Sequence, residues 1–69
     1  MTQKERISKY LDDFGSITQL DAMKDLGIMR LGARIWEMVR EGERIVTEME
    51  SSKNRYGQTV RYARYKRAV

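Results

Sequence analysis

Residues 17–44, ITQLDAMKDLGIMRLGARIWEMVREGER, predict two short helices joined by a sharp turn at Gly27. We expect the helices over residues 19–26 and 30–41, because apolar residues recur in both at helical spacing. Glycine adopts the left-handed backbone conformation at little cost, so Gly27 can end the first helix and redirect the chain. Two helices joined by so short a turn must cross at a steep angle.

Two pairs of residues have the spacing of a capping box, in which a hydroxyl and an acidic side chain three residues later each accept the other's backbone N–H. Thr18 with Asp21 marks the start of the first helix of this pair. Thr2 with Glu5 marks an earlier helix over residues 3–14. Three helices can then close around one core. The expected core residues are Ile7, Tyr10, Leu11 and Phe14, then Ala22, Met23 and Leu26, and finally Leu31, Ile35, Met38 and Val39.

After Gly42 the apolar period changes from about 3.6 to 2, which is the period of a β-strand. Residues 43–50 and 58–67 predict two strands joined by a polar loop over residues 51–57. They should pair as an antiparallel hairpin over about 43–67 that packs on the helices, since an isolated hairpin is only marginally stable. The alternation leaves open which face of the second strand is buried.

Composition limits the possible chemistry. A chain of 69 residues has room for one domain, residues 1–69, and for only a small core. It contains neither cysteine nor histidine, which removes thiol and imidazole chemistry and most zinc sites. We therefore expect no enzyme, metal or cofactor. We also expect a cytoplasmic protein, because no apolar run approaches the roughly 20 residues of a membrane span and the N-terminus lacks a signal-peptide core.

Basic residues dominate the C-terminal part of the chain. Residues 51–69 hold six of the 14 Lys and Arg and none of the 10 Asp and Glu, with three tyrosines among them. Such a block is either a solvated surface or a site for a polyanion. The alternation of cations with aromatic residues in an extended segment favours nucleic acid.

Four stretches of the sequence, ITQLDA (17–22), LGIMRL (26–31), ARI (33–35) and YARY (62–65), resemble the small winged helix-turn-helix proteins of phages and prophages. The resemblance covers nearly the whole chain. It implies a mainly α fold with a β-hairpin (α+β), a three-helix winged helix-turn-helix. It also implies DNA binding in transcription regulation or recombination, in the cytoplasm of a bacterial host, with the protein nucleoid-associated when bound.

The outward face of helix 30–41 follows from the 100° that a helix advances per residue. Early positions of a recognition helix normally reach base edges. The expected base-reading residues are therefore Met29, Arg30, Ala33, Trp36 and Glu37. Arg30 leads because a guanidinium can bond two acceptors of guanine at once; the alternative is a solvated helix-end arginine.

Three features of this helix have a structural alternative. Arg34 is angled toward the core edge, where we expect an ion pair with Asp21 or Asp25 that fixes the helix crossing. Trp36 either contacts a base or packs beside the hairpin. Met29 cannot cap the helix, so N–H groups at its start are free for a DNA phosphate or for water.

The hairpin and the end of the helix supply the expected backbone contacts. A basic loop beside a groove-reading helix can bind flanking phosphates or place an arginine in a narrow minor groove. The residues assigned to phosphate or minor-groove contact are Arg40, Lys53, Asn54, Arg55, Tyr56, Arg61 and Arg64.

These observations predict sequence-specific binding of double-stranded DNA by a monomer or weak dimer on DNA. The expected task is that of a transcriptional regulator or a recombination accessory factor. The alternative is a protein-interaction module of the same fold that binds or inhibits a host or phage protein through Trp36, the tyrosines and the basic hairpin.

Overall fold

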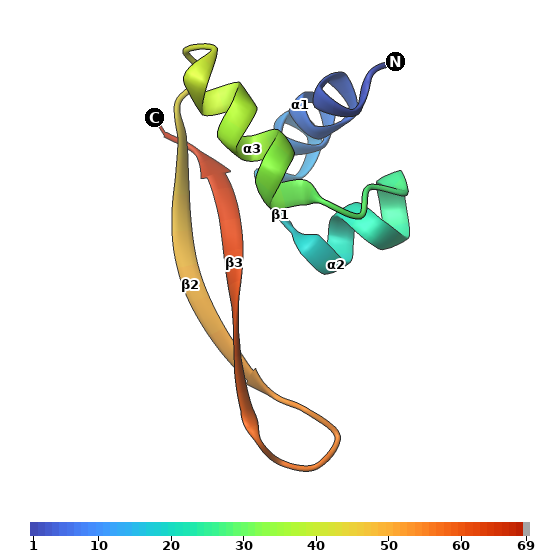
Figure 1. Ribbon diagram of the computed structural model, residues 1–69, viewed down its shortest axis with the longest axis vertical. Coiled ribbons are helices and arrows are strands. Elements are labelled where there is room, and N and C mark those ends of the chain that lie inside the picture. The colour runs from blue at the N-terminus through green and yellow to red at the C-terminus, as the bar shows by residue number, and fades with distance from the viewer. Residues whose placement is uncertain (69) are drawn as a thin grey trace.

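The computed structural model describes residues 1–68 as a cluster of helices from which a long hairpin projects (Figure 1). The principal extents are 38 × 24 × 21 Å. The elements in chain order are α1 (Gln3–Phe14), β1 (Ser16–Thr18), α2 (Gln19–Asp21), η1 (Ala22–Leu26), α3 (Leu31–Arg40), β2 (Ile45–Lys53) and β3 (Thr59–Arg67).

Both capping boxes form. The Thr2 hydroxyl accepts from the Glu5 N–H at 3.1 Å, and a Glu5 carboxylate oxygen accepts from the Thr2 N–H at 2.9 Å. These two bonds hold the pKa of Glu5 below its ordinary value. Thr18 and Asp21 repeat the arrangement at the start of α2 with distances of 3.2 and 3.0 Å. The spacing in the sequence therefore locates both helix starts.

The expected regular helix over residues 19–26 is instead one α-helical turn followed by the wider π-helical turn η1. The Ile28 N–H reaches back to the Ala22 carbonyl at 2.9 Å, after Gly27 has turned the chain with φ 70°. The end of η1 is also bound from outside, because Arg6 of α1 donates to the Leu26 carbonyl at 2.8 Å. Apolar periodicity does not report this local widening.

The sheet has three antiparallel strands in the order β1-β3-β2. Ser16–Thr18, for which no strand was predicted, pairs with β3 and places Ile17 opposite Tyr65. Three residues are too few to show a period of 2, and their partner lies far along the chain. β2 also ends later than expected, since polar Ser51–Lys53 continue the ladder against Thr59–Arg61, whereas β3 keeps almost the expected bounds.

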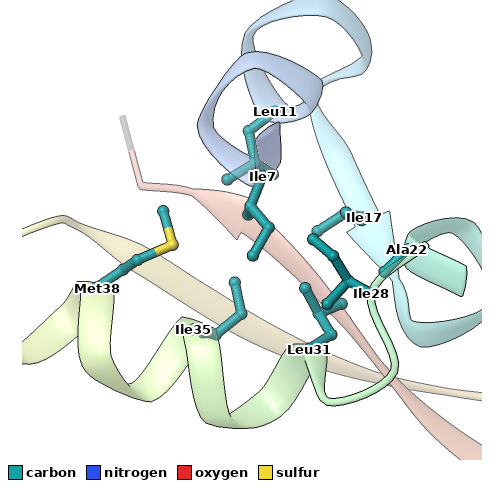
Figure 2. Close-up of a cluster of buried hydrophobic side chains, with 8 residues drawn as sticks. All are labelled: Ile7, Leu11, Ile17, Ala22, Ile28, Leu31, Ile35 and Met38. Carbon is teal, nitrogen blue, oxygen red and sulfur yellow. The ribbon is translucent and has the colours of Figure 1, made fainter. Parts of the chain in front are cut away.

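The core lies between the helices and the base of the sheet (Figure 2). Ile17 and Ile28, which the helical pattern omitted, belong to it because β1 and the turn after Gly27 face inward. The buried side chains are Ile7, Leu11, Ile17, Ala22, Ile28, Leu31, Ile35 and Met38. Phe14, Met23 and Val39 were wrongly assigned to the core: all three are exposed, because each helix buries a narrower face than its apolar stripe predicts.

Arg67 connects the end of the sheet to two other parts of the molecule. Its guanidinium lies 3.2 Å from an Asp12 carboxylate oxygen and 2.9 Å from one of Glu43, and it donates to the Ser8 carbonyl at 3.3 Å. Arg67 therefore joins β3 to α1 and to the segment that follows α3.

The Tyr10 hydroxyl donates to an Asp25 carboxylate oxygen at 2.6 Å, joining α1 to η1. This bond, with some burial, raises the pKa of Tyr10 to about 12. A folded-state pKa above the unfolded value of about 10 means that the stabilisation is complete below pH 10 and is lost as pH rises toward 12.

We predict that the wild-type protein loses stability relative to Tyr10→Phe between pH 10 and 12. Denaturant unfolding of both proteins across this range measures the difference, and the shared titration of the lysines cancels. A constant difference over the range contradicts the assignment.

Candidate nucleic-acid interface

The start of α3 is held by a side chain from α2. Arg30 is the N-cap residue of α3 and forms no side-chain cap. Instead, the Gln19 side-chain oxygen accepts from the Leu31 N–H at 2.9 Å, and the Gln19 side-chain NH₂ donates to the Ile28 carbonyl at 2.9 Å. Met29 does not cap the helix, as expected, but the Leu31 N–H is not free because Gln19 binds it. The sequence pattern missed this contact, since only the folding of the chain brings Gln19 to the turn.

The expected base-reading residues occupy the outer part of α3 and the turn before it. Met29 is 68% exposed, and Arg30 is also exposed. Ala33 is half-buried. Trp36 is 60% exposed and lies outside the core, so much of its ring is accessible to a ligand. Glu37 is half-buried and engaged with cations, at 3.0 Å from Arg34 and 3.9 Å from Lys4.

The expected ion pair of Arg34 with Asp21 or Asp25 is wrong. Asp21 is used in the capping box and Asp25 accepts from Tyr10, so neither reaches Arg34. The Nε atom of Arg34 lies 3.0 Å from a Glu37 carboxylate oxygen, although the N–H is not aligned for a hydrogen bond. The ion pair of Arg34 therefore lies within α3 and does not fix the crossing of the helices.

The sheet register shows which face of the hairpin packs on the core at the base of the sheet. Paired residues of an antiparallel ladder share a face, and Tyr65, which is paired with Thr47, packs against the core. Tyr65 also lies beside α3, because a Cβ added at Gly32 would be only 3.5 Å from the Tyr65 hydroxyl. We call this side the inner face, with residues Ile45, Thr47, Met49, Ser51, Lys53, Thr59, Arg61, Ala63, Tyr65 and Arg67. The outer face has Val46, Glu48, Glu50, Ser52, Val60, Tyr62, Arg64 and Lys66.

Charge is divided unequally between the two faces. Both carboxylates of the hairpin strands, Glu48 and Glu50, lie on the outer face, where Lys66 is 3.0 Å from Glu48 and Arg64 is 2.9 Å from Glu50. The inner face has no carboxylate. Beyond its base, Lys53 and Arg61 have no ion-pair partner within residues 1–68. The inner face is therefore the side with uncompensated positive charge.

Arg64 belongs to the outer face and not to the surface shared with α3. Its Nε donates to Glu50, and its Nη1 donates to the Ser16 hydroxyl at 3.0 Å. The hydrogen bond from Arg64 holds the pKa of Glu50 below its ordinary value. These contacts anchor β3 to its two neighbouring strands. Arg64 thus has partners within the fold, and its expected contact with DNA stays a prediction.

The tip of the hairpin is organised by Asn54. Its side-chain oxygen accepts from the N–H groups of Tyr56 and Gln58, each at 3.0 Å, and its side-chain NH₂ donates to the Gln58 side chain at 3.0 Å. Asn54 thus shapes the turn. It presents Arg55 and Tyr56 to solvent, with Tyr56 85% exposed.

Of the six basic residues in the C-terminal block, three are neutralised within the fold: Arg64, Lys66 and Arg67. The three that remain are Lys53, Arg55 and Arg61. Arg40 adds a further exposed cation at the end of α3, where its guanidinium carbon lies 4.6 Å from the centroid of the Trp36 ring. Among these seven basic residues, the free positive charge is found at the hairpin tip, on the inner face and on α3.

The described residues contain no helix long and apolar enough to cross a membrane. Within the same part of the chain, no group of three or more His, Cys, Asp or Glu is placed to hold a metal ion.

Two helices joined at a glycine turn, a third helix before them and a hairpin after them define a winged helix-turn-helix protein. A family model described as a winged helix-turn-helix domain matches residues 2–68, and the chain belongs to that family. The expected α+β fold class is confirmed. Comparison with curated proteins gave no match, and comparison with solved structures gave none. Membership of the family suggests DNA binding, which is more typical of such domains than catalysis.

We predict that Gln19→Ala lowers the free energy of unfolding by about 1–3 kcal/mol, because it leaves the Leu31 N–H and the Ile28 carbonyl without partners in a partly buried turn. Leu20→Ala, at the next position of α2, is the control, since the Leu20 side chain is exposed and its truncation should cost little stability. Urea denaturation measures both. Equal effects of the two substitutions contradict the role given to Gln19.

Proposed function

We propose that this chain binds double-stranded DNA in a sequence-specific manner, with α3 in the major groove and the inner face of the hairpin along the flanking backbone. The observation that carries the proposal is the division of charge between the hairpin faces. Carboxylates are confined to the outer face, whereas the inner face and α3 carry cations without partners. A surface of this sign suits the phosphate backbone, which supplies much of the affinity of DNA-binding proteins.

Base reading is assigned to Arg30 first, with Met29, Ala33 and Trp36 as neighbours on the same surface. Arg30 stands at the start of α3, is exposed and has no ion-pair partner within residues 1–68. Its guanidinium is therefore free to form two hydrogen bonds with guanine in the major groove. Glu37 contributes less, because two cations already hold its carboxylate.

Phosphate contact is assigned to the cations that the fold leaves free. Lys53 and Arg61 lie on the inner face, where they can bind phosphates of the flanking DNA backbone. Arg55, beside Tyr56 at the hairpin tip, can bind the same backbone or enter a narrow minor groove. Arg40 extends the basic surface along α3. Asn54 supports these contacts by shaping the turn.

The proposed task is that of a phage or prophage regulator of transcription or a recombination accessory factor, which rests on the resemblance of the sequence to those proteins. The protein would act in the bacterial cytoplasm as a monomer or as a weak dimer on DNA. The second candidate is a protein-interaction module. It is supported by a hollow of about 410 Å³ beside α1 and η1, where exposed Phe14 lies against Tyr10 with ring centroids 4.6 Å apart.

We predict that affinity for a duplex falls steeply with salt. About four phosphate contacts give a slope near −3.6 in log affinity against log salt, or a loss of about 150-fold in affinity between 50 and 200 mM. Fluorescence anisotropy with a labelled duplex measures this slope. Arg61→Ala on the inner face should make it shallower by about 1, whereas Lys66→Ala on the outer face removes the same charge with little change.

Equal effects of Arg61→Ala and Lys66→Ala contradict the assignment of the inner face to DNA. A flat salt response, or no binding at low salt, contradicts DNA binding itself and favours the protein-interaction module.

We predict that Arg30→Ala relaxes the preference for one base pair by about 1–3 kcal/mol while leaving non-specific affinity nearly intact. Selection of bound duplexes from a random pool, carried out with both proteins, measures the preference position by position. Lys53→Ala is the matched control, because loss of a phosphate contact weakens all sequences alike. An unchanged sequence preference in Arg30→Ala contradicts its assignment as base reader.

A further inference from the structure

Arg40 and Trp36 form a cation–π pair on the exposed side of α3. They are four residues apart, which places their side chains one turn from each other on the same side of the helix. The guanidinium carbon of Arg40 lies 4.6 Å from the ring centroid, within the range over which the indole face attracts a cation. The ring thereby limits the many rotamers of a long arginine side chain.

The carboxylates nearest to Arg40 in the chain are already occupied by other cations. Lys4 of α1 forms ion pairs with Glu41 and, at 3.9 Å, with Glu37, and the hydrogen bond to Glu41 raises the pKa of Lys4. Arg34 lies 3.0 Å from Glu37. Arg40, Glu37 and Glu41 line one hollow on the surface of α3. Arg40 nevertheless has no ion pair or side-chain hydrogen bond within residues 1–68, because other cations occupy the two carboxylates.

We infer that Trp36 is a positioning residue, not a base reader, and that it holds Arg40 ready to bind a DNA phosphate. The inference rests on the proposed function and assigns a different role to one of its residues. The ring lies on one side of the guanidinium, so N–H groups directed away from the ring stay available. Those groups match two oxygens of a phosphate, which is the geometry in which arginine binds this group best.

The test is a double-mutant cycle in duplex binding. Arg40→Ala and Trp36→Leu should each weaken binding by about two- to fivefold, the range expected from an exposed cation–π contact and one phosphate contact. The double variant should bind no more weakly than Arg40→Ala alone, because Trp36 acts through Arg40. Trp36→Phe retains an aromatic face and should restore most of the affinity.

Arg44 provides the matched control. Arg44 is exposed and lacks a side-chain partner within residues 1–68. Its substitution by Ala removes the same charge as Arg40→Ala. The effects of Arg44→Ala and Trp36→Leu should multiply. The chain has one tryptophan, so fluorescence of the free protein reports Trp36 directly. Arg40→Ala should change its emission and Arg44→Ala should not.

Multiplying effects of Trp36→Leu and Arg40→Ala would overturn the inference, since they would show two independent contacts. Full binding by Trp36→Leu, or unchanged emission in Arg40→Ala, would overturn it as well. In each of these cases, salt-dependent binding of duplex DNA by the wild-type protein would still support the proposed function. If the wild-type protein fails to bind duplex DNA at low salt, the proposed function fails instead, and the inference falls with it.

Discussion

The two hydrogen bonds of the Gln19 side chain are the interaction on which the geometry of the proposed interface depends. They join the first residue of α2 to the carbonyl of Ile28 and the N–H of Leu31, so they span the whole turn between the crossed helices. A free helix start next to Met29 would leave the first turn of α3 able to fray. The Gln19 contacts hold the backbone around Arg30 in one conformation. The side chains that would read DNA bases therefore have a defined position, as recognition requires.

The sheet turns a modest net charge into a one-sided distribution. The formal charge of the chain is only +4, and half of the C-terminal basic block is paired within the fold. Because the strands alternate between faces, Glu48 and Glu50 fall together on the side that also carries Arg64 and Lys66. Compensation of charge on the outer face leaves the inner face positive, and the net charge alone does not reveal this.

Local signals in the sequence were sufficient for much of the fold. The capping boxes and Gly27 located the helix starts and the turn, and a change of apolar period indicated the hairpin. Features that depend on residues distant in the chain were missed: β1 is defined by β3, and Gln19 binds a turn nine to twelve residues away. Alternation along the strand separates Arg61 from Arg64, but it does not show which of the two faces packs on the core. Both residues were therefore expected to contact phosphate.

The most direct test of the central claim follows side-chain methyl groups by NMR while a mixed-sequence duplex is added at low salt. Met49 is exposed on the inner face and Met29 precedes α3, whereas Val46 and Val60 are exposed on the outer face. We predict that the methyl signals of Met29 and Met49 shift on binding and that those of Val46 and Val60 remain in place. Shifts confined to the outer-face valines, or to Met23 on η1, would contradict the claim that DNA lies against α3 and the inner face.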